Sequence, residues 1–320
     1  MKRRQFIKTA GLVTAAGTQA WGAGSEKPAS GLGPVRMYVG CQRGPTTETM
    51  LSFYKRHGVD HICGFPPDPG GRGHWTVEEV QRTRDLCEKH GVTLDMVALP
   101  FLTSSHIDRE KRGAIMLGQS PERDQDIEDI QKMIVACAKA GVPAFKYNMS
   151  LLGVVRTAST PGRGGAVYST WRGAEAKPNP PLTRAGVVTE EMAWERISYF
   201  LERIIPVCNE YKVRAACHPH DPGTPKEGYQ GIYNVLGTVE GLKKFVSIQE
   251  SPFHGLNFCL GTIAENLDDP ARSYSTWCDI SGNGRKSSTH FRNIRGKRGS
   301  FQEVYHDEGD LNMPPARGVA

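Results

Sequence analysis

The chain has 320 residues, with 40 Lys and Arg against 34 Asp and Glu, which gives a net charge of +6. Four of the positive charges (Lys2, Arg3, Arg4 and Lys8) lie in the first eight residues, and subtracting these four leaves +2 for the rest. That balance is too weak for general nucleic-acid binding, and the remaining length suits one large α/β domain.

The first 24 residues have the pattern of an export signal. Paired arginines are followed by Phe6 and Lys8 and then by a mildly apolar stretch that reaches Ala23, which is typical of the twin-arginine route. The stretch is too short to be a stable membrane anchor. We therefore expect residues 1–24 to be a signal peptide of a periplasmic or otherwise exported protein. The alternative is a basic, disordered N-terminus.

Strand-like and helix-like runs alternate after this segment, which predicts a parallel α/β fold of the (β/α)₈ barrel type. Strands are expected at 35–39, 59–65, 92–99, 142–147, 213–217, 256–259 and 288–289. Helices are expected at 46–56, 76–90, 124–140, 189–211 and 239–247. The second helix has a capping box, because Thr76 precedes Glu79 by three residues.

Three stretches depart from this alternation. Residues 149–188 are rich in Gly, Pro, Thr and Arg and are too long for an ordinary connection, which predicts a functional lid or insertion. Residues 270–288 show no helical period and many turn formers, so we expect no helix there and suspect local reading-frame damage or truncation. Pro314 and Pro315 predict a disordered tail over 314–320.

No strand-like run follows residue 290 that could complete the barrel. We therefore expect an incomplete TIM-barrel domain over 35–313 that lacks its eighth βα unit, with an open seam between the seventh and first strands. The eight cysteines form no Cys-x-x-Cys pair. Their scatter favours small buried side chains over a disulfide framework.

Three candidate metal ligands follow successive strands: His218, Cys259 and His290. They are 41 and 31 residues apart, about one βα unit, so in a barrel they would meet at the carboxyl ends of the strands. Two imidazoles and a thiolate can hold a transition metal, and by softness zinc fits as well as iron or manganese. Taken singly, each has a plainer interpretation, a structural histidine or a buried core cysteine.

Other polar residues flank these positions. His220 and Asp221 could orient the ligand His218 or could be surface loop residues. Gly261 and Thr262 would allow close approach of backbone or substrate beside Cys259. Arg292 could hold a carboxylate bidentately or form a surface salt bridge.

Four blocks of sequence together resemble the mannonate dehydratase family of the xylose isomerase-like barrels, from about residue 35 to 313. They are His218-Pro219-x-Asp221-Pro222, Cys259-x-Gly261-Thr262, His290-Phe291-Arg292-Asn293, and residues 301–306 with Gly309-Asp310. The segments 75–79 and 147–148 are also similar to the family. The resemblance implies dehydration of D-mannonate to 2-keto-3-deoxy-D-gluconate in glucuronate breakdown, a small-molecule sugar acid as substrate, and a homodimer.

The resemblance also implies Mn²⁺ or Fe²⁺ held by two histidines, a cysteine and an aspartate, and it makes His218, Cys259 and His290 the first three ligands; Zn²⁺ is not excluded. The family's Pro-Asp-His segment, which carries the aspartate ligand and a catalytic histidine, is absent from this sequence, as is a glutamate near the end of the third strand. No catalytic residue can therefore be assigned, and impaired turnover is expected.

Substrate contacts are expected from Tyr147 and Asn148, which could bind sugar hydroxyls, and from Arg156 and Arg292, which could position the substrate. Ordinary strand-end packing is the plainer interpretation of the first two. Two other functions fit the same ligands: a metal-dependent sugar isomerase or epimerase on the same barrel, and a non-catalytic exported sugar-acid binding protein.

Overall fold

A computed structural model describes residues 38–223, 225, 228–281 and 286–311, all within one compact unit that spans Met37–Ala320. The expected signal peptide at 1–24 and the expected tail at 314–320 lie outside the described residues, and so do positions 35–37 of the first predicted strand. Among the described residues, no helix is both long enough and apolar enough to span a membrane.

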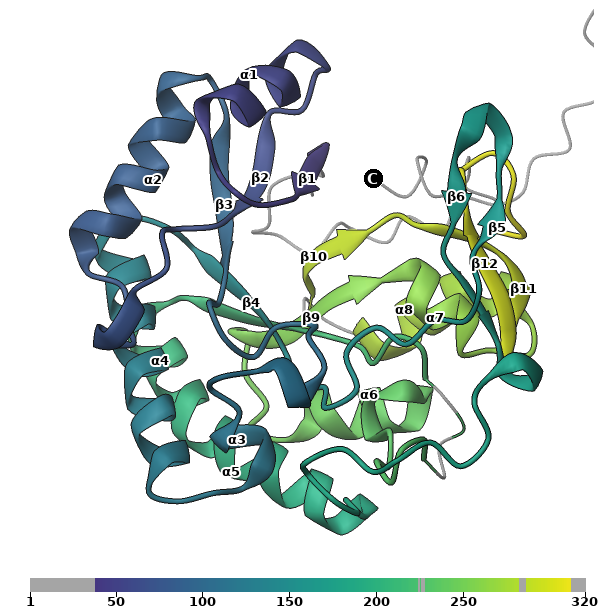
Figure 1. Cartoon of the computed structure of the whole chain (residues 1–320). Helices are drawn as coiled ribbons and strands as arrows, with labels where there is room; N and C mark the ends of the chain where they lie inside the picture. Colours follow the sequence, from purple (N-terminus) through teal and green to yellow (C-terminus); the bar gives the residue numbers. More distant parts are fainter. Residues whose placement is uncertain (1–37, 224, 226–227, 282–285, 312–320) are drawn as a thin grey trace, which may run out of the picture. The chain divides into compact units, whose positions relative to one another are not determined.

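Seven parallel strands form the central sheet (Figure 1), and they follow one another in chain order. They are β1 (Gly40–Gln42), β2 (His61–Gly64), β3 (Thr93–Ala98), β4 (Ala144–Asn148), β8 (Arg214–His218), β9 (His254–Cys259) and β10 (Lys286–His290). The predicted α/β class is confirmed, and within the described residues there is neither an eighth parallel strand nor pairing between β10 and β1. The first strand begins at residue 40 rather than at 35.

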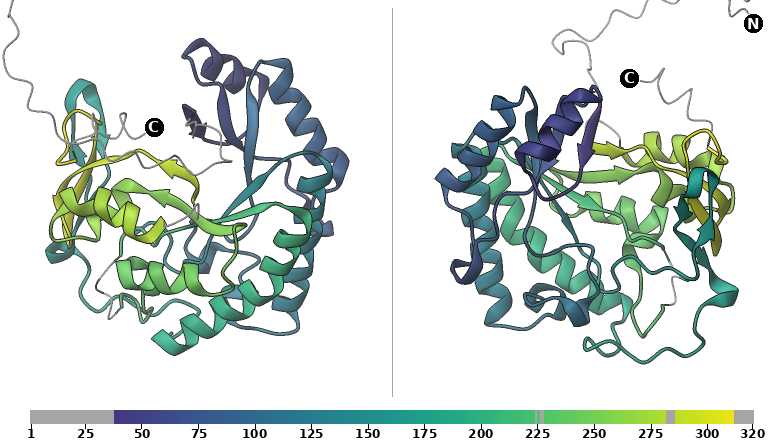
Figure 2. Two further views of the ribbon diagram at one scale, coloured as in Figure 1. Left: turned by 180° about the vertical axis from the view of Figure 1, so that it is seen from behind. Right: turned by 45° about the horizontal axis from the view of Figure 1, so that its top comes forward.

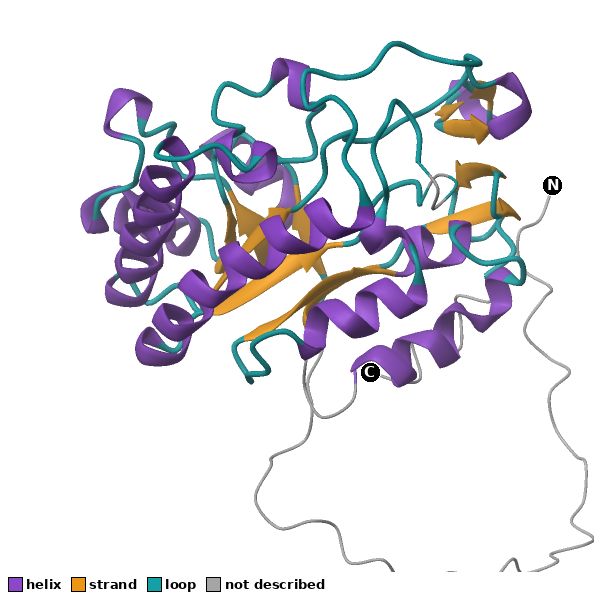
Figure 3. Cartoon of the chain, turned by 90° about the horizontal axis from the view of Figure 1, so that it is seen from below, coloured by secondary structure: helices purple, strands orange, loops and turns teal. Residues whose placement is uncertain are grey.

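Helices connect these strands and run alongside them (Figure 3). They are α1 (Glu48–Arg56), α2 (Val77–Lys89), α3 (Ala114–Leu117), α4 (Glu122–Lys139), α5 (Glu190–Tyr211), α6 (Val239–Ser247), α7 (Leu260–Glu265) and α8 (Ser273–Ser281). Short 3₁₀ turns occupy Gly70–Arg72, Ile107–Arg109, Arg163–Gly165, Gly173–Glu175, Val235–Gly237 and Pro270–Arg272.

Four of the long helices begin after a threonine whose hydroxyl accepts a hydrogen bond from a backbone N–H three residues on. These N-caps are Thr47, Thr76, Thr189 and Thr238. Such a side chain satisfies one of the free N–H groups of the first turn and contributes about 1 kcal/mol. The capping box predicted at Thr76 is confirmed, since Glu79 also accepts from the Thr76 N–H.

The prediction that residues 270–288 contain no helix is wrong. Pro270 begins a 3₁₀ turn after Asp269, and α8 follows it directly. Among the α8 residues whose side chains the structure describes, the buried ones are Ser273, Thr276 and Ile280, which are spaced three and four residues apart as on one face of a helix. Two of the three are small and polar, so the helical period is invisible to a search for apolar residues.

The long insertion at 149–188 contains strands of its own. The strands β5 (Thr160–Pro161) and β6 (Val167–Tyr168) form a hairpin, and β7 (Thr170–Arg172) joins β12 (Ser300–Val304), which pairs with β11 (Asn293–Lys297). Figure 2 shows this hairpin, in teal, beside the yellow C-terminal strands. The predicted insertion is thus confirmed in its location, and the insertion pairs with the β11–β12 hairpin.

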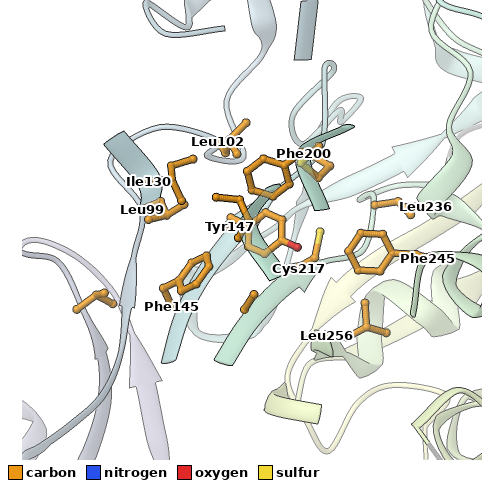
Figure 4. Close-up of a cluster of buried hydrophobic side chains, with 14 of the residues drawn as sticks. Leu99, Leu102, Ile130, Phe145, Tyr147, Phe200, Cys217, Leu236, Phe245 and Leu256 are labelled. Carbon is orange, nitrogen blue, oxygen red and sulfur yellow. The ribbon is translucent and has the colours of Figure 1, made fainter. Parts of the chain in front are cut away.

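The main core lies where the helices cover the sheet, and a smaller group fills the opposite side of the strands. Phe145 and Tyr147 of β4 point into the main core with Phe200 of α5 (Figure 4). Ala144 belongs to the smaller group, whose other buried members are Met96 and Ala216. Since successive side chains of a strand alternate in direction, Lys146 and Asn148 also point to the side away from α5.

None of the eight cysteines forms a disulfide, as predicted. Five are buried, Cys41 and Cys63 are half-buried, and Cys278 is exposed. The buried and half-buried cysteines therefore act as small packing residues, with the exception of Cys259, which lies at the carboxyl end of β9.

Candidate metal centre and cavity

His218, Cys259 and His290 are the last residues of three neighbouring strands, β8, β9 and β10. The strand register places His290 directly beside Cys259. One ligand atom from each of the three lies within 4.8 Å of the others, and the two imidazole rings are 5.3 Å apart at their centroids. The structure therefore gathers the three predicted ligands at one point, although they are scattered along the sequence.

Hydrogen bonds fix which nitrogen of each imidazole is free. His218 Nδ1 lies 2.7 Å from the carbonyl oxygen of Pro219, and a carbonyl only accepts, so Nδ1 carries the proton and Nε2 keeps its lone pair. His290 Nε2 lies 3.1 Å from Oε1 of Gln42 on β1, which leaves the lone pair of Nδ1 available. Such second partners orient the imidazole ligands of metal sites.

The sulfur of Cys259 is held as a thiolate. Burial opposes ionisation, but the Arg292 guanidinium holds the pKa of the Cys259 thiol well below its usual range. Burial lowers the pKa of His290, which favours its neutral, ligating form. A thiolate with two neutral imidazoles is a donor set that fits a divalent transition metal, and three protein ligands leave a position open for substrate.

A buried ionic network lies directly beside this centre. Asp221 accepts from Arg156 at 2.6 Å and from Arg292 at 3.0 Å. Arg292 also contacts Glu303 at 2.7 Å and Glu265 at 3.2 Å, and Arg156 is hydrogen-bonded to Glu303. The two arginines therefore face three protein carboxyl groups.

The protonation states of the carboxyl groups make this network neutral. Although burial opposes it, Arg292 and Arg156 hold the pKa of Asp221 well below its ordinary value. Burial and the neighbouring Asp221 raise the pKa of Glu265 well above its ordinary value, which favours the protonated form that can donate to Asp221. Asp221 and Glu303 then balance the charges of the two arginines.

These contacts change the roles expected for Arg156 and Arg292. Their guanidinium groups are engaged by carboxylates of the protein, so the prediction that they hold the substrate is not supported by their positions. Arg292 does line the cavity described below, whereas Arg156 is not among its lining residues. The close approach predicted at Gly261 is confirmed, because a Cβ there would lie 2.6 Å from Arg292 Nε.

The structure also answers the question of His220 and Asp221. Neither is a surface residue, and neither orients the His218 ring, which is bonded to Pro219. Asp221 pairs with the arginines, whereas His220 is buried with Nε2 2.9 Å from the carbonyl oxygen of Met149. Burial lowers the pKa of His220 to about 4, so it is neutral and structural.

The three candidate ligands open onto a cavity of about 340 Å³, large enough for a small sugar acid. Its lining consists of Gln42, Ser104, Lys146, Asn148, Ser150, Gly153, Val154, His218, Pro219, Asp221, Cys259, His290 and Arg292. Asn148 therefore lies where the sequence predicts it. Tyr147 does not, and its predicted contact with substrate is wrong in direction: its ring is 5.3 Å from that of Phe200 in the core, because it alternates with Lys146 and Asn148.

Lys146 is the main cavity residue that the sequence interpretation missed. Its side chain is 8% exposed, and burial lowers the pKa of its ammonium group. A lysine in a strand is usually read as a surface residue. The available signal was its spacing of two residues from Asn148, which places both on one face of β4.

The chain is similar in sequence to known mannonate dehydratases. A family model described as D-mannonate dehydratase (UxuA) matches residues 180–316. The chain is 27% identical over 304 residues to mannonate dehydratase 2 of Halalkalibacterium halodurans, covering 84% of this chain and 82% of that protein. It is 28% identical over 295 residues to mannonate dehydratase of Thermotoga maritima, covering 81% and 77%.

Solved structures support the fold. The crystal structure of mannonate dehydratase from Streptococcus suis serotype 2 has a TM-score of 0.74 at 22% identity and covers 88% of this chain and 79% of that one. A D-tagatose 3-epimerase-like protein has a TM-score of 0.54 at 13% identity, with 87% and 83% covered. The fold is accordingly TIM-barrel-like, with seven parallel strands in the described residues.

Proposed function

We propose a function from one premise: the chain belongs to the mannonate dehydratase family of the xylose isomerase-like TIM barrels. The proposed reaction is the metal-assisted dehydration of D-mannonate to 2-keto-3-deoxy-D-gluconate. The observation that carries the proposal is the convergence of His218, His290 and the Cys259 thiolate on one open cavity. The relatives named above are mannonate dehydratases at 27–28% identity, which supports the reaction class.

The donor set is suited to holding a divalent cation with a vacant side toward the cavity. A metal bound there would act as a Lewis acid on oxygens of the substrate and stabilise negative charge that develops when the C2 proton leaves. The family resemblance favours Mn²⁺ or Fe²⁺, and the sulfur ligand suits Zn²⁺ as well. Metal analysis of protein purified without added metal would identify the resident ion.

The chain's own residues supply orientation around this centre. Asn148 presents an amide to the cavity and can bind sugar hydroxyls. The Pro219 carbonyl and Gln42 keep the imidazoles of His218 and His290 in place. Dehydration also needs a base for the C2 proton and an acid for the departing C3 hydroxyl; no residue among those described is assigned to these two roles.

The test is to incubate metal-loaded protein with D-mannonate and to assay for a 2-keto-3-deoxy acid. We expect slow, metal-dependent turnover in the wild type, because neither the base nor the acid is assigned among the described residues. The Cys259→Ser variant should lose metal affinity by more than about 100-fold, because serine does not ionise at neutral pH and so cannot replace the thiolate. Removal of a group that only hydrogen-bonds to a metal ligand already costs about 10–100-fold. Cys278→Ser, which changes an exposed cysteine, is the matched control and should retain both metal and activity.

Other outcomes would redirect the assignment. A rearranged sugar acid without loss of water would indicate the isomerase or epimerase alternative. Tight binding of D-mannonate with no product would indicate a non-catalytic sugar-acid binding protein. Retention of metal by Cys259→Ser at wild-type stoichiometry and affinity would contradict the proposed centre itself.

We also propose that the protein is exported through the twin-arginine route, on the pattern of residues 1–24. That route carries folded proteins, so Cys259 could take up its metal before it reaches an oxidising compartment. Replacing both Arg3 and Arg4 with lysine should retain the protein in the cytoplasm, and unchanged export of that double variant would refute the route.

A further inference from the structure

Lys146 lies on β4, two residues before the strand end, and lines the same cavity as the candidate metal centre. It is paired in register with Ala216 of β8, two residues before the pair formed by Asn148 and His218. The buried cluster on the same side of the sheet consists of Ala144, Ala216 and Met96. The ammonium group therefore reaches into the cavity that Cys259 and His290 also line.

The Lys146 ammonium makes no direct contact with a carboxylate of the described residues, although the Cys259 thiolate in the same cavity attracts it. Arg156 and Arg292 are neutralised by Asp221 and Glu303, as described above. By contrast, no hydrogen bond or ion pair within the described ranges engages the Lys146 ammonium, although its side chain is 8% exposed. Leaving a buried charge without a hydrogen-bonded partner is costly, and an anion bound in the adjoining cavity would supply that partner.

A cation bound at the centre would engage the Cys259 thiolate and add positive charge to the cavity. A divalent cation bound by one thiolate and two neutral imidazoles keeps a positive charge, and Lys146 adds another in the same cavity. An anionic ligand compensates both charges, whereas a neutral polyol compensates neither. The cavity therefore favours acids over neutral sugars of the same size.

We propose that Lys146 is a substrate-binding residue that holds the carboxylate of the sugar acid, the role that the sequence alone suggested for Arg292. This inference deepens the proposed function and rests on it for the identity of the acid. The arginines are positioning residues, since they act on the cavity through Asp221 and Cys259. Lys146 thereby determines the specificity for an acid.

The experiment compares Lys146→Met with the wild type, using calorimetric titration of metal-loaded protein with D-mannonate and with D-mannitol, its neutral counterpart. A charge-assisted hydrogen bond is worth enough that Lys146→Met should weaken D-mannonate binding by about 10- to 100-fold. Binding of D-mannitol and metal content should not change. Lys146→Arg should restore part of the affinity for the acid, and Lys139→Met, an exposed lysine at the end of α4, should match the wild type.

A purely structural role for Lys146 makes a different prediction. If the lysine only stabilised the fold, Lys146→Met would lower the melting temperature; removal of an unpaired buried charge should instead leave it unchanged or raise it. Equal affinity of Lys146→Met and wild type for D-mannonate would overturn the inference while leaving the proposed function intact.

A second probe separates failure of the inference from failure of the proposed function. If the wild type binds no D-mannonate, the proposed substrate is wrong, and glycolate with ethylene glycol then serves as the smallest acid and neutral pair. Saturation-transfer NMR should show glycolate bound to the wild type and not to Lys146→Met, with ethylene glycol unaffected. Absence of glycolate binding to the wild type, or equal binding to both proteins, would overturn the role of Lys146.

Discussion

At the residue scale, the protonation state of Glu265 decides whether the network beside the candidate metal centre contains two carboxylates or three. Glutamine has the shape of a protonated glutamate and can also donate to Asp221, so Glu265→Gln should change the free energy of unfolding by less than about 1 kcal/mol. Asp221→Asn removes the carboxylate that both arginines share and should cost about 3–5 kcal/mol. Urea denaturation at pH 7 measures both values. A cost for Glu265→Gln as large as that for Asp221→Asn would mean that Glu265 is ionised.

The sequence was most informative at this scale where residues sit at equivalent points of a repeating unit. His218, Cys259 and His290 could be predicted to converge because strand ends of a parallel sheet meet at one edge. The partners of Arg292 could not be predicted, because Glu265 and Glu303 reach it from a helix and from an antiparallel strand that the barrel pattern does not include. Lys146 was missed although its position in the strand could be predicted, because a lysine in a strand is usually interpreted as a surface residue.

At the scale of elements, α8 gives the sharpest test of the fold. Thr276 is buried on the face of α8 that packs toward α6 and α7, whereas Ser275 is exposed. Thr276→Asp should therefore destabilise the protein by about 3 kcal/mol or more, because an unpaired charge enters the interior. Ser275→Asp, one residue earlier, should have an effect within about 0.5 kcal/mol. Similar costs for the two variants in thermal unfolding would contradict this orientation of the helix.

Elements with strong local determinants were predicted well, and those without them were not. The helix α6 spans Val239–Ser247, as expected, and α5 begins directly after Thr189; both have a threonine cap and an apolar face. The pairing of β7 with β12 joins segments that are more than a hundred residues apart. Such pairing depends on tertiary packing and leaves no periodic trace in either segment.

At the scale of the whole described unit, His254 should make stability depend on pH. Burial lowers the pKa of His254 to about 4, against 6.5 in an unfolded chain. As the pH falls, the unfolded state therefore binds a proton before the folded state does. The contribution of neutral His254 to the free energy of unfolding is full above pH 6.5 and is lost between pH 6.5 and 4. The loss is on the order of 3 kcal/mol.

The variant His254→Leu removes this titration. Its free energy of unfolding should fall less steeply between pH 6.5 and 4 than that of the wild type, as measured by denaturant unfolding across that range. His306→Gln replaces an exposed histidine and should keep the wild-type slope. An unchanged slope in His254→Leu would show that this imidazole is protonated as easily in the folded state as in the unfolded state.

The order of the seven parallel strands follows from the alternating pattern of the sequence, because each βα unit adds its strand beside the previous one. What the pattern cannot specify is the contact between the first and last strands, which are joined by no connecting helix. In the structure these strands meet through the side chains of Gln42 and His290, 248 residues apart.

That contact has a kinetic consequence. A single hydrogen bond of this kind contributes about 1 kcal/mol, so thermal fluctuation separates the two outermost strands far more readily than it breaks a backbone ladder. Each separation also releases the imidazole of a candidate ligand. A metal ion bound at the centre should therefore dissociate faster than its affinity alone suggests. We expect Gln42 to affect the residence time of the ion more than its equilibrium occupancy.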